Sequence, residues 1–163
     1  MKRVIIVRHA KTIQHGYDQD FDRTLTDHGR DDSERTSMEM ARNGILPELI
    51  ISSPAVRTTQ TTRIFADTFG YPTGNVRYEK KLYSGMLTTT FLKMLHEIDD
   101  RHTTVMVVGH NPTVYNYLDM LLPGFCLDVP TCSTIVIEFD IEQWSDLIPY
   151  TGRMTNRWIP DLL

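Results

Sequence analysis

The sequence has few cysteines, no long apolar run and no excess of basic residues. Its two cysteines, Cys126 and Cys132, do not form a C-x-x-C pair, which argues against a disulfide framework. Only four apolar residues follow Met1–Arg3, too few for the apolar core of a signal peptide, and no run is long enough for a transmembrane helix. We therefore expect a soluble, cytoplasmic protein without a membrane partner.

The charge balance limits the partners further. The chain has 17 Lys and Arg against 21 Asp and Glu, a formal net charge of −4, so nucleic acid is not an expected partner. With 163 residues, 40% of them hydrophobic, it is long and apolar enough for a sizeable core. No internal repeat or flexible linker is visible, so we expect one domain spanning residues 1–163.

Apolar runs that predict strands alternate with segments that predict helices. Strands are expected at 2–7, 49–52, 76–78, 103–108, 133–139 and 153–159, and helices at 26–43, 54–69, 89–98 and 112–122. Near-continuous apolar strands are typical of parallel sheets that are buried on both faces. The expected architecture is a three-layer α/β fold, with a mostly parallel central sheet between two layers of helices.

The most informative residues are Arg8 and His9, which come directly after the apolar run 4–7. A strand that ends here brings a guanidinium and an imidazole together to the edge of the sheet. A neutral histidine can act as a nucleophile, and arginine offers a planar fork of donors to phosphate oxygens. The pair therefore suits the attack of a histidine nitrogen on a bound phosphoryl group.

A second strand end carries the same kind of side chain. After the strand at 49–52, Ser53 is a good helix N-cap and Pro54 a good first helical residue. Arg57 then lies in the first turn of the helix, where its guanidinium adds a full positive charge to an anion-binding helix start.

A third strand, at 103–108, leads into His110, followed by an expected cap, Asn111, and by Pro112. Taken singly, such residues are more often surface or core residues than catalytic ones. Ligands of open α/β sheets bind outside the carboxyl ends of the strands, however, so the three junctions should meet at one edge. The candidate site residues are therefore Arg8, His9, Arg57 and His110.

Other catalytic motifs fit less well. The stretch Asp20–Thr24 matches the D-x-D-x-T motif of magnesium-dependent aspartyl phosphatases, but residues 15–19 cannot form the buried strand that should precede it. The same stretch begins like a calcium loop, but Arg23 occupies the glycine position. No G-x-S-x-G elbow is present, and neither cysteine has the arginine that a cysteine phosphatase needs. The remaining histidines are expected on the surface or on helix faces: His15, His28, His96 and His102.

Together these motifs resemble those of the histidine phosphatase superfamily, also called the phosphoglycerate-mutase-like family, and especially its short SixA-type members. The segments that carry the resemblance are Val7–Lys11, Leu25–Arg30, Ser53–Thr61 and Val108–Pro112. Ala10 departs from the glycine of many relatives, and residues 140–163 carry no matching motif. The resemblance implies a phosphoglycerate-mutase-like fold and a phosphatase that works through a phosphohistidine enzyme intermediate.

The residues and the resemblance predict the same mechanism. His9 attacks phosphorus, and water then hydrolyses the phosphohistidine. Arg8, Arg57 and His110 bind the phosphoryl group, and the two guanidiniums keep His9 neutral. Phosphoryl transfer depends mainly on positioning and charge neutralisation, so we expect no metal ion and no other cofactor.

The resemblance also bears on the general acid and on the substrate. Longer relatives use a glutamate after the second motif, for which Glu79 is the candidate; the alternative is a solvated Glu79 beside two lysines. The interval 58–109 leaves little room for the large cap domain of those relatives. An open pocket favours phosphohistidine on a protein, of the phosphorelay or phosphotransfer type. The alternatives are a phosphatase of small phosphoesters and a phosphate-binding module without catalysis.

Overall fold

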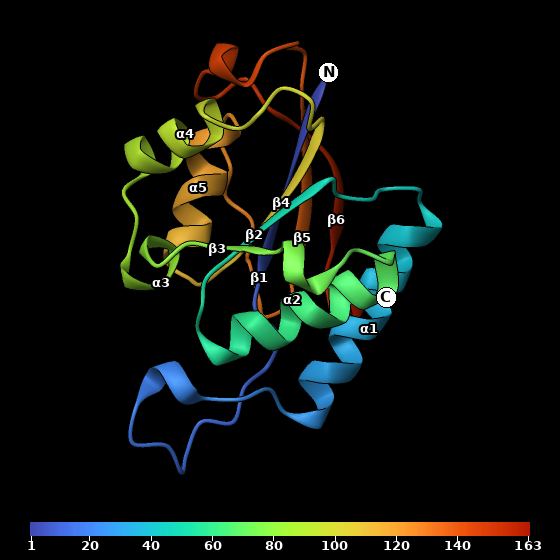
Figure 1. Ribbon diagram of the computed structural model, residues 1–163, viewed down its shortest axis with the longest axis vertical. Helices are drawn as coiled ribbons and strands as arrows, with labels where there is room; N and C mark the ends of the chain where they lie inside the picture. Colours follow the sequence, from blue (N-terminus) through green and yellow to red (C-terminus); the bar gives the residue numbers. More distant parts are fainter.

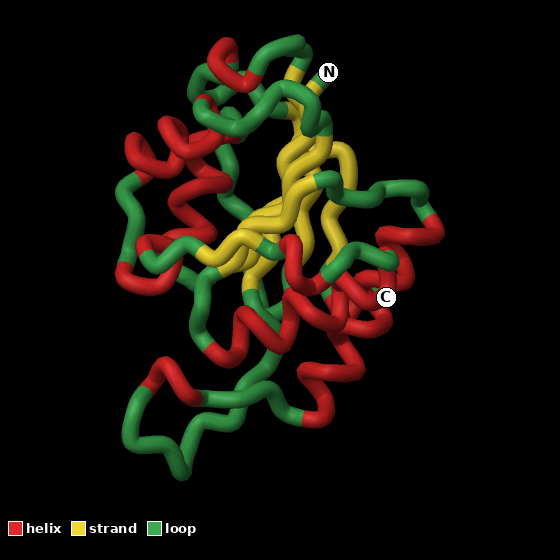
Figure 2. Tube along the Cα trace, viewed as in Figure 1, coloured by secondary structure: helices red, strands yellow, loops and turns green.

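The computed structural model describes all residues from Met1 to Leu163. Its strands are β1 (Lys2–Arg8), β2 (Leu49–Ser52), β3 (Arg77–Tyr78), β4 (Thr104–Gly109), β5 (Thr134–Phe139) and β6 (Arg153–Trp158). They form one six-stranded sheet in the order β3-β2-β4-β1-β5-β6 (Figures 1 and 2). None of the helices has the length and apolar character that crossing a membrane requires.

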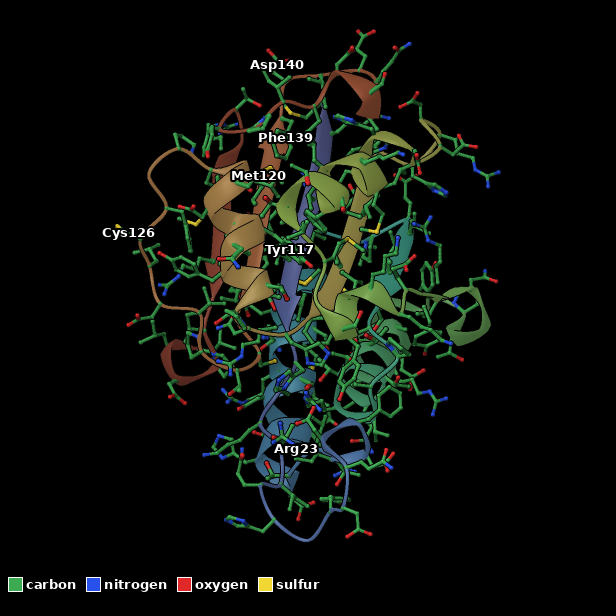
Figure 3. The ribbon with its side chains drawn as sticks, turned by 90° about the vertical axis from the view of Figure 1, so that its left-hand side faces the viewer. Arg23, Tyr117, Met120, Cys126, Phe139 and Asp140 are labelled. Atoms are coloured by element: carbon green, nitrogen blue, oxygen red, sulfur yellow. The ribbon has the colours of Figure 1, made fainter.

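The strand directions confirm the expected mostly parallel sheet. Strand β1 pairs in parallel with β4, and β2 pairs in parallel with both β3 and β4. Strand β5 is antiparallel to β1, and β6 is antiparallel to β5, so β5 alone runs the opposite way. Asp140, which follows β5, accordingly lies at the opposite end of the molecule from Arg23 (Figure 3). The carboxyl ends of β1, β2 and β4 therefore share one edge.

Alternation of side chains along the strands divides the core into two layers. In β1, Val4 and Ile6 belong to the layer that includes α3 (Lys81–Ser84), α4 (Thr88–His96) and α5 (Thr113–Leu121). Ile5 and Val7 belong to the layer that includes α1 (Asp27–Arg42) and α2 (Val56–Phe69). Helices therefore cover both faces, as Figure 1 shows, and the three-layer expectation is confirmed. Only short elements connect α2 to β4, so no large cap domain is inserted there.

The start of α1 fixes the chain that follows β1. Thr26 is its N-cap, as expected, and accepts a hydrogen bond from the Gly29 amide (2.9 Å). A side chain at Gly29 would collide with the backbone of Lys11, so glycine is required for this close approach. The Thr26 amide also donates to the Lys11 carbonyl (2.9 Å). These contacts hold the backbone just beyond His9 in place.

Two helices begin later than expected. Helix α2 begins at Val56, with Ala55 as its N-cap residue, and α5 begins at Thr113. The Ser53 hydroxyl contacts a histidine, and the Asn111 amide donates to the Val129 carbonyl (3.1 Å), so neither side chain caps its helix in the expected way. Arg57 becomes the second residue of α2, still within its first turn.

Candidate active site

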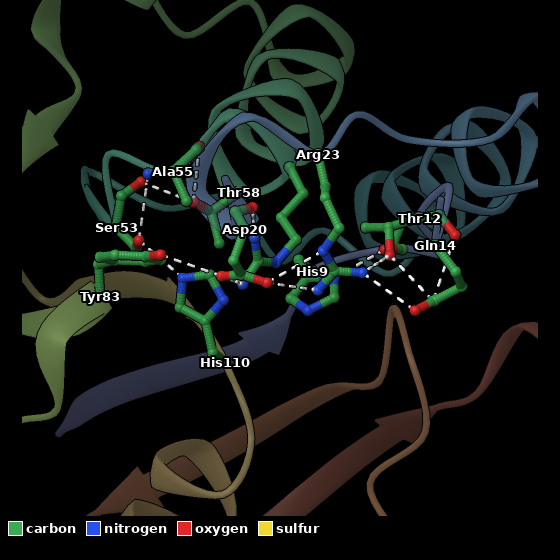
Figure 4. Close-up of polar contacts among 12 residues, drawn as sticks. His9, Thr12, Gln14, Asp20, Arg23, Ser53, Ala55, Thr58, Tyr83 and His110 are labelled. Atoms are coloured by element: carbon green, nitrogen blue, oxygen red, sulfur yellow. Dashed lines mark hydrogen bonds and ion pairs between the residues drawn. The ribbon is translucent and has the colours of Figure 1, made fainter. Parts of the chain in front are cut away.

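The four candidate residues converge at the carboxyl edge of the sheet, where Figure 4 shows two of them, His9 and His110. Arg8 is the last residue of β1 and pairs with Gly109, the last residue of β4. His9 and His110 therefore leave neighbouring strands side by side, and their ring centroids are 5.3 Å apart. Strand β2 pairs with the other side of β4, which brings Arg57 from the following helix to the same edge.

The surroundings of His9 define its tautomer and its charge. Its Nδ1 lies 2.7 Å from the carbonyl oxygen of Ala10, which can only accept a hydrogen bond, so Nδ1 carries the proton. The lone pair is then on Nε2. Burial and the nearby guanidiniums of Arg57, Arg8 and Arg23 lower the pKa of His9 to about 4, against the opposing effect of the Ala10 bond. At neutral pH, His9 is an uncharged imidazole with a free Nε2 electron pair.

His110 is neutral for similar reasons. Its side chain is buried, and burial, Arg57 and His9 lower its pKa to about 3. Its Nε2 lies 2.7 Å from the hydroxyl oxygen of Ser53. Its Nδ1 is buried and has no hydrogen-bond partner, and Figure 4 shows this second nitrogen on the side of the ring that faces His9.

Both arginines are anchored at one part of the guanidinium and unpartnered at another. Arg8 donates from Nη1 to the Val129 carbonyl (3.0 Å). Arg57 donates from Nη1 to the Asp20 carbonyl and from Nη2 to Oδ2 of Asp20 (both 2.9 Å). The Nε–H groups of Arg8 and Arg57 are buried without a partner. An unpaired buried donor is costly, and an anion in this site would supply the acceptors that are missing.

Sequence reasoning missed Asp20 and Arg23 as part of this site. The Asp20 carboxylate accepts hydrogen bonds from Arg57, from Nε of Arg23 (3.0 Å) and from the Tyr83 hydroxyl (3.0 Å), and it forms an ion pair with Nη2 of Arg23 (2.9 Å). These donors, led by Arg57, outweigh burial and lower the pKa of Asp20 to about 2, so it stays ionised. Asp20 lies in a short 3-10 helix (Asp20–Asp22), not at a strand end. The i,i+3 spacing of Asp20 and Arg23 was the available signal.

Tyr83 of α3 closes one side of the site. Its ring packs edge-on against His110 (5.6 Å) and lies over the Arg57 guanidinium (5.9 Å), while Phe21 packs against it edge-on (5.1 Å). Burial and the hydrogen bond to Asp20 raise the pKa of Tyr83, so the hydroxyl remains a donor. No local sequence pattern identifies this residue, because its contacts come from distant segments.

The Glu79 side chain lies elsewhere. Its Oε1 accepts weakly from the Lys81 amide (3.4 Å), and its side chain lines a cleft of about 420 Å³ with Arg77 and Lys93. None of its hydrogen bonds reaches the two histidines or Arg57. As regards metals, no three His, Cys, Asp or Glu side chains come together in a way that could hold an ion.

Comparison with known proteins finds similarity in both sequence and fold. Residues 4–82 match the family model of the histidine phosphatase superfamily, branch 1. The chain is 26% identical over 159 residues to an uncharacterised chloroplastic protein of Arabidopsis thaliana, covering 93% of this chain and 72% of the plant protein.

Solved structures of the same fold include two SixA proteins. SixA from Agrobacterium tumefaciens has a TM-score of 0.79 and 28% identity, with 98% of each chain covered. A protein histidine phosphatase SixA in complex with tungstate has a TM-score of 0.80 and 21% identity, again with 98% of each chain covered. The family match and the structure from Agrobacterium tumefaciens support a histidine phosphatase of the short SixA type.

Proposed function

We propose that this phosphatase removes the phosphoryl group from phosphohistidine on a protein, through a phosphohistidine intermediate on His9. One observation carries the proposal: a neutral His9 with a free Nε2 lies among buried donors that have no partner, on Arg8 and Arg57. A phosphoryl group is the ligand that needs both a nucleophile and several donors. The match of residues 4–82 to the family model of the superfamily supports the reaction class.

The proposed reaction has two steps. In the first, the Nε2 lone pair of His9 forms a bond to phosphorus while the bond from phosphorus to the substrate nitrogen breaks, and the departing imidazole takes up a proton. Arg8, Arg57 and His110 stabilise the equatorial oxygens. In the second, water attacks the phosphohistidine, a proton is released, and inorganic phosphate and neutral His9 result. No metal ion or organic cofactor takes part in this scheme.

The substrate class follows from the absence of a large cap domain and from the leaving group. Without a large cap domain, remote parts of a small phosphoester find little to bind, and binding energy cannot lower the barrier. An imidazole leaves more easily than an alkoxide, so a substrate of this kind depends less on a general acid. The structure from Agrobacterium tumefaciens, named as a candidate phosphohistidine phosphatase, supports the same choice.

A comparison of substrates tests the proposal. The purified chain is given a phosphohistidine-carrying phosphotransfer protein and a panel of small phosphoesters, and phosphate release is followed. We expect the larger kcat/KM for the phosphoprotein. Glu79→Gln should change this kcat/KM little. Glu97→Gln, which changes a glutamate of the same cleft, is its control.

Two results would redirect the assignment. If a small phosphoester is the better substrate and Glu79→Gln cripples its hydrolysis, the chain is a small-phosphoester phosphatase that uses Glu79 as its acid. If the chain binds phosphate but releases none from any substrate, it is a phosphate-binding module.

A further inference from the structure

Ser53 contacts His110 from a buried position that is fixed by several hydrogen bonds. It is the residue directly after β2, it is fully buried, and its amide donates to the Val108 carbonyl of β4 (3.0 Å). Two hydroxyls hold its own carbonyl, those of Ser52 (2.9 Å) and Thr58 (2.8 Å). The Ser53 side chain is thereby fixed against His110, with Oγ 2.7 Å from Nε2.

The hydrogen-bonding capacity of the Ser53 hydroxyl distinguishes the two tautomers of His110. The oxygen already accepts from the Ala55 amide (3.3 Å), and its own hydrogen has no acceptor other than Nε2 of His110. If Nε2 carried the ring proton, the hydroxyl hydrogen would be buried without an acceptor, at a cost in free energy. If Nε2 carries the lone pair, both hydrogen bonds of Ser53 are satisfied.

The opposite ring nitrogen leads to the same tautomer. Nδ1 of His110 is buried without a partner, and it faces the side where His9 lies (Figure 4). The oxygens of a bound phosphoryl group only accept hydrogen bonds, so they attract Nδ1 when it carries a proton and repel it when it carries a lone pair. Phosphate binding and the Ser53 contact thus both require Nδ1–H.

We propose that Ser53 is a positioning residue that donates its hydroxyl hydrogen to Nε2 of His110 and so holds His110 as the Nδ1–H tautomer, the form that donates to the phosphoryl group. The inference rests on the proposed function, because a phosphoryl group is the ligand that needs this donor. Ser53 itself does not touch the substrate. Its position one residue beyond β2 matters because β2 and β4 are neighbours, so that Ser53 and His110 face each other across the sheet edge.

The tautomer can be measured directly. In ¹⁵N-labelled protein at neutral pH, long-range ¹H–¹⁵N correlation spectra of the imidazole distinguish a protonated from an unprotonated ring nitrogen, and His110→Gln assigns the signals. We expect protonated Nδ1 and unprotonated Nε2 in the wild type. A protonated Nε2 in the wild type would overturn the inference, whatever the activity of the enzyme.

Substitution separates positioning from folding. In Ser53→Ala, we expect the Nδ1–H signature to be weakened or lost, and inorganic phosphate to bind about tenfold or more weakly, the size typical for loss of a group that orients a histidine. Ser37→Ala is the matched control, since Ser37 is also buried but contacts Thr68 between α1 and α2 and touches neither Ser53 nor His110; it should retain the signature and bind phosphate within about twofold of the wild type. Equal behaviour of the two variants would refute the positioning role.

The two proposals fail in different ways. The enzyme could release no phosphate from phosphohistidine and still show an Nδ1–H signal on His110 that Ser53→Ala weakens. That result overturns the proposed substrate alone. An active phosphohistidine phosphatase with Nε2–H on His110 overturns the role of Ser53 alone.

Discussion

The imidazoles of His9 and His110 lie 5.3 Å apart with their planes inclined by 55°, and each has one nitrogen fixed by a hydrogen bond. Both have pKa values far below that of a free histidine, at about 4 and about 3. At neutral pH, the positive charge beside them therefore comes from arginine alone. This combination keeps the proposed nucleophile His9 uncharged, while the guanidiniums can still attract an anion.

The first prediction is a loss of stability on acidification. The unfolded chain binds a proton at a histidine near pH 6.5, whereas folded His9 binds it near pH 4. Between these values the unfolded state binds more protons, so the free energy of unfolding rises with pH and falls as the pH is lowered. For His9 the loss from pH 7 to pH 4.5 is roughly 2–3 kcal/mol.

Urea unfolding at the two pH values measures this loss. His9→Asn should reduce the pH dependence, and His15→Asn, at an exposed histidine, should leave it unchanged. Equal pH dependence in the wild type and in His9→Asn would show that the folded pKa of His9 is not lowered.

The second prediction concerns Arg57. Replacing it by alanine removes a charged donor aimed at the phosphoryl oxygens, an interaction worth about 3–4 kcal/mol in comparable sites, so kcat/KM should fall on the order of a hundredfold or more. Arg57→Lys should restore little, because lysine lacks the planar fork that also holds Asp20. Arg63→Ala, exposed on the same helix, serves as the control in steady-state assays. Wild-type rates in both Arg57 variants would return this residue to a structural role.

The third prediction concerns Asp20. Asp20→Asn removes a negative charge beside the phosphate position but keeps a side-chain oxygen that can accept from Arg57. Repulsion between one carboxylate and an anion at a partly exposed site costs on the order of 1 kcal/mol of binding free energy. Inorganic phosphate should therefore inhibit Asp20→Asn about threefold to tenfold more strongly than the wild type. Asp22→Asn, in the same short 3-10 helix but outside the ion-pair cluster, should change inhibition little. Weaker inhibition in Asp20→Asn would mean that orientation of Arg57 by the carboxylate outweighs its charge.

The fourth prediction is that hydrolysis survives an excess of chelator, because Arg8 and Arg57 supply the positive charge that a metal ion would otherwise provide. Phosphate release is measured with and without EDTA. Loss of activity that magnesium restores would contradict this prediction. It would favour the interpretation of Asp20–Thr24 as the D-x-D-x-T motif of a magnesium-dependent phosphatase, and Asp20→Asn would test that interpretation.

The strands and the three strand ends could be predicted because their signals are local. Apolar runs define β1, β2 and β4. His9 and His110 directly follow β1 and β4, and Arg57 follows β2 in the first turn of α2, so adjacency in the sheet brings them together. The starts of α2 and α5 were misplaced because Ser53 and Asn111 look like caps but bond to distant partners.

The remainder of the site could not be read from local patterns. Asp20 meets Arg57 across 37 positions and Tyr83 across 63, through a loop that folds back over the strand ends. Such contacts depend on tertiary packing, for which no periodicity or cap residue gives a signal. The role of Ser53 likewise appears only when β2 and β4 are known to be neighbours.

The fifth prediction, on the nucleophile, tests the central claim most directly. The enzyme is mixed with a ³²P-labelled phosphohistidine protein and quenched in alkali within the first turnover, and the labelled site is mapped by peptide analysis. We expect label on Nε2 of His9, stable in base and lost in acid, with no label and no turnover in a folded His9→Ala variant. Full turnover in His9→Ala, or label on any other residue, would contradict it.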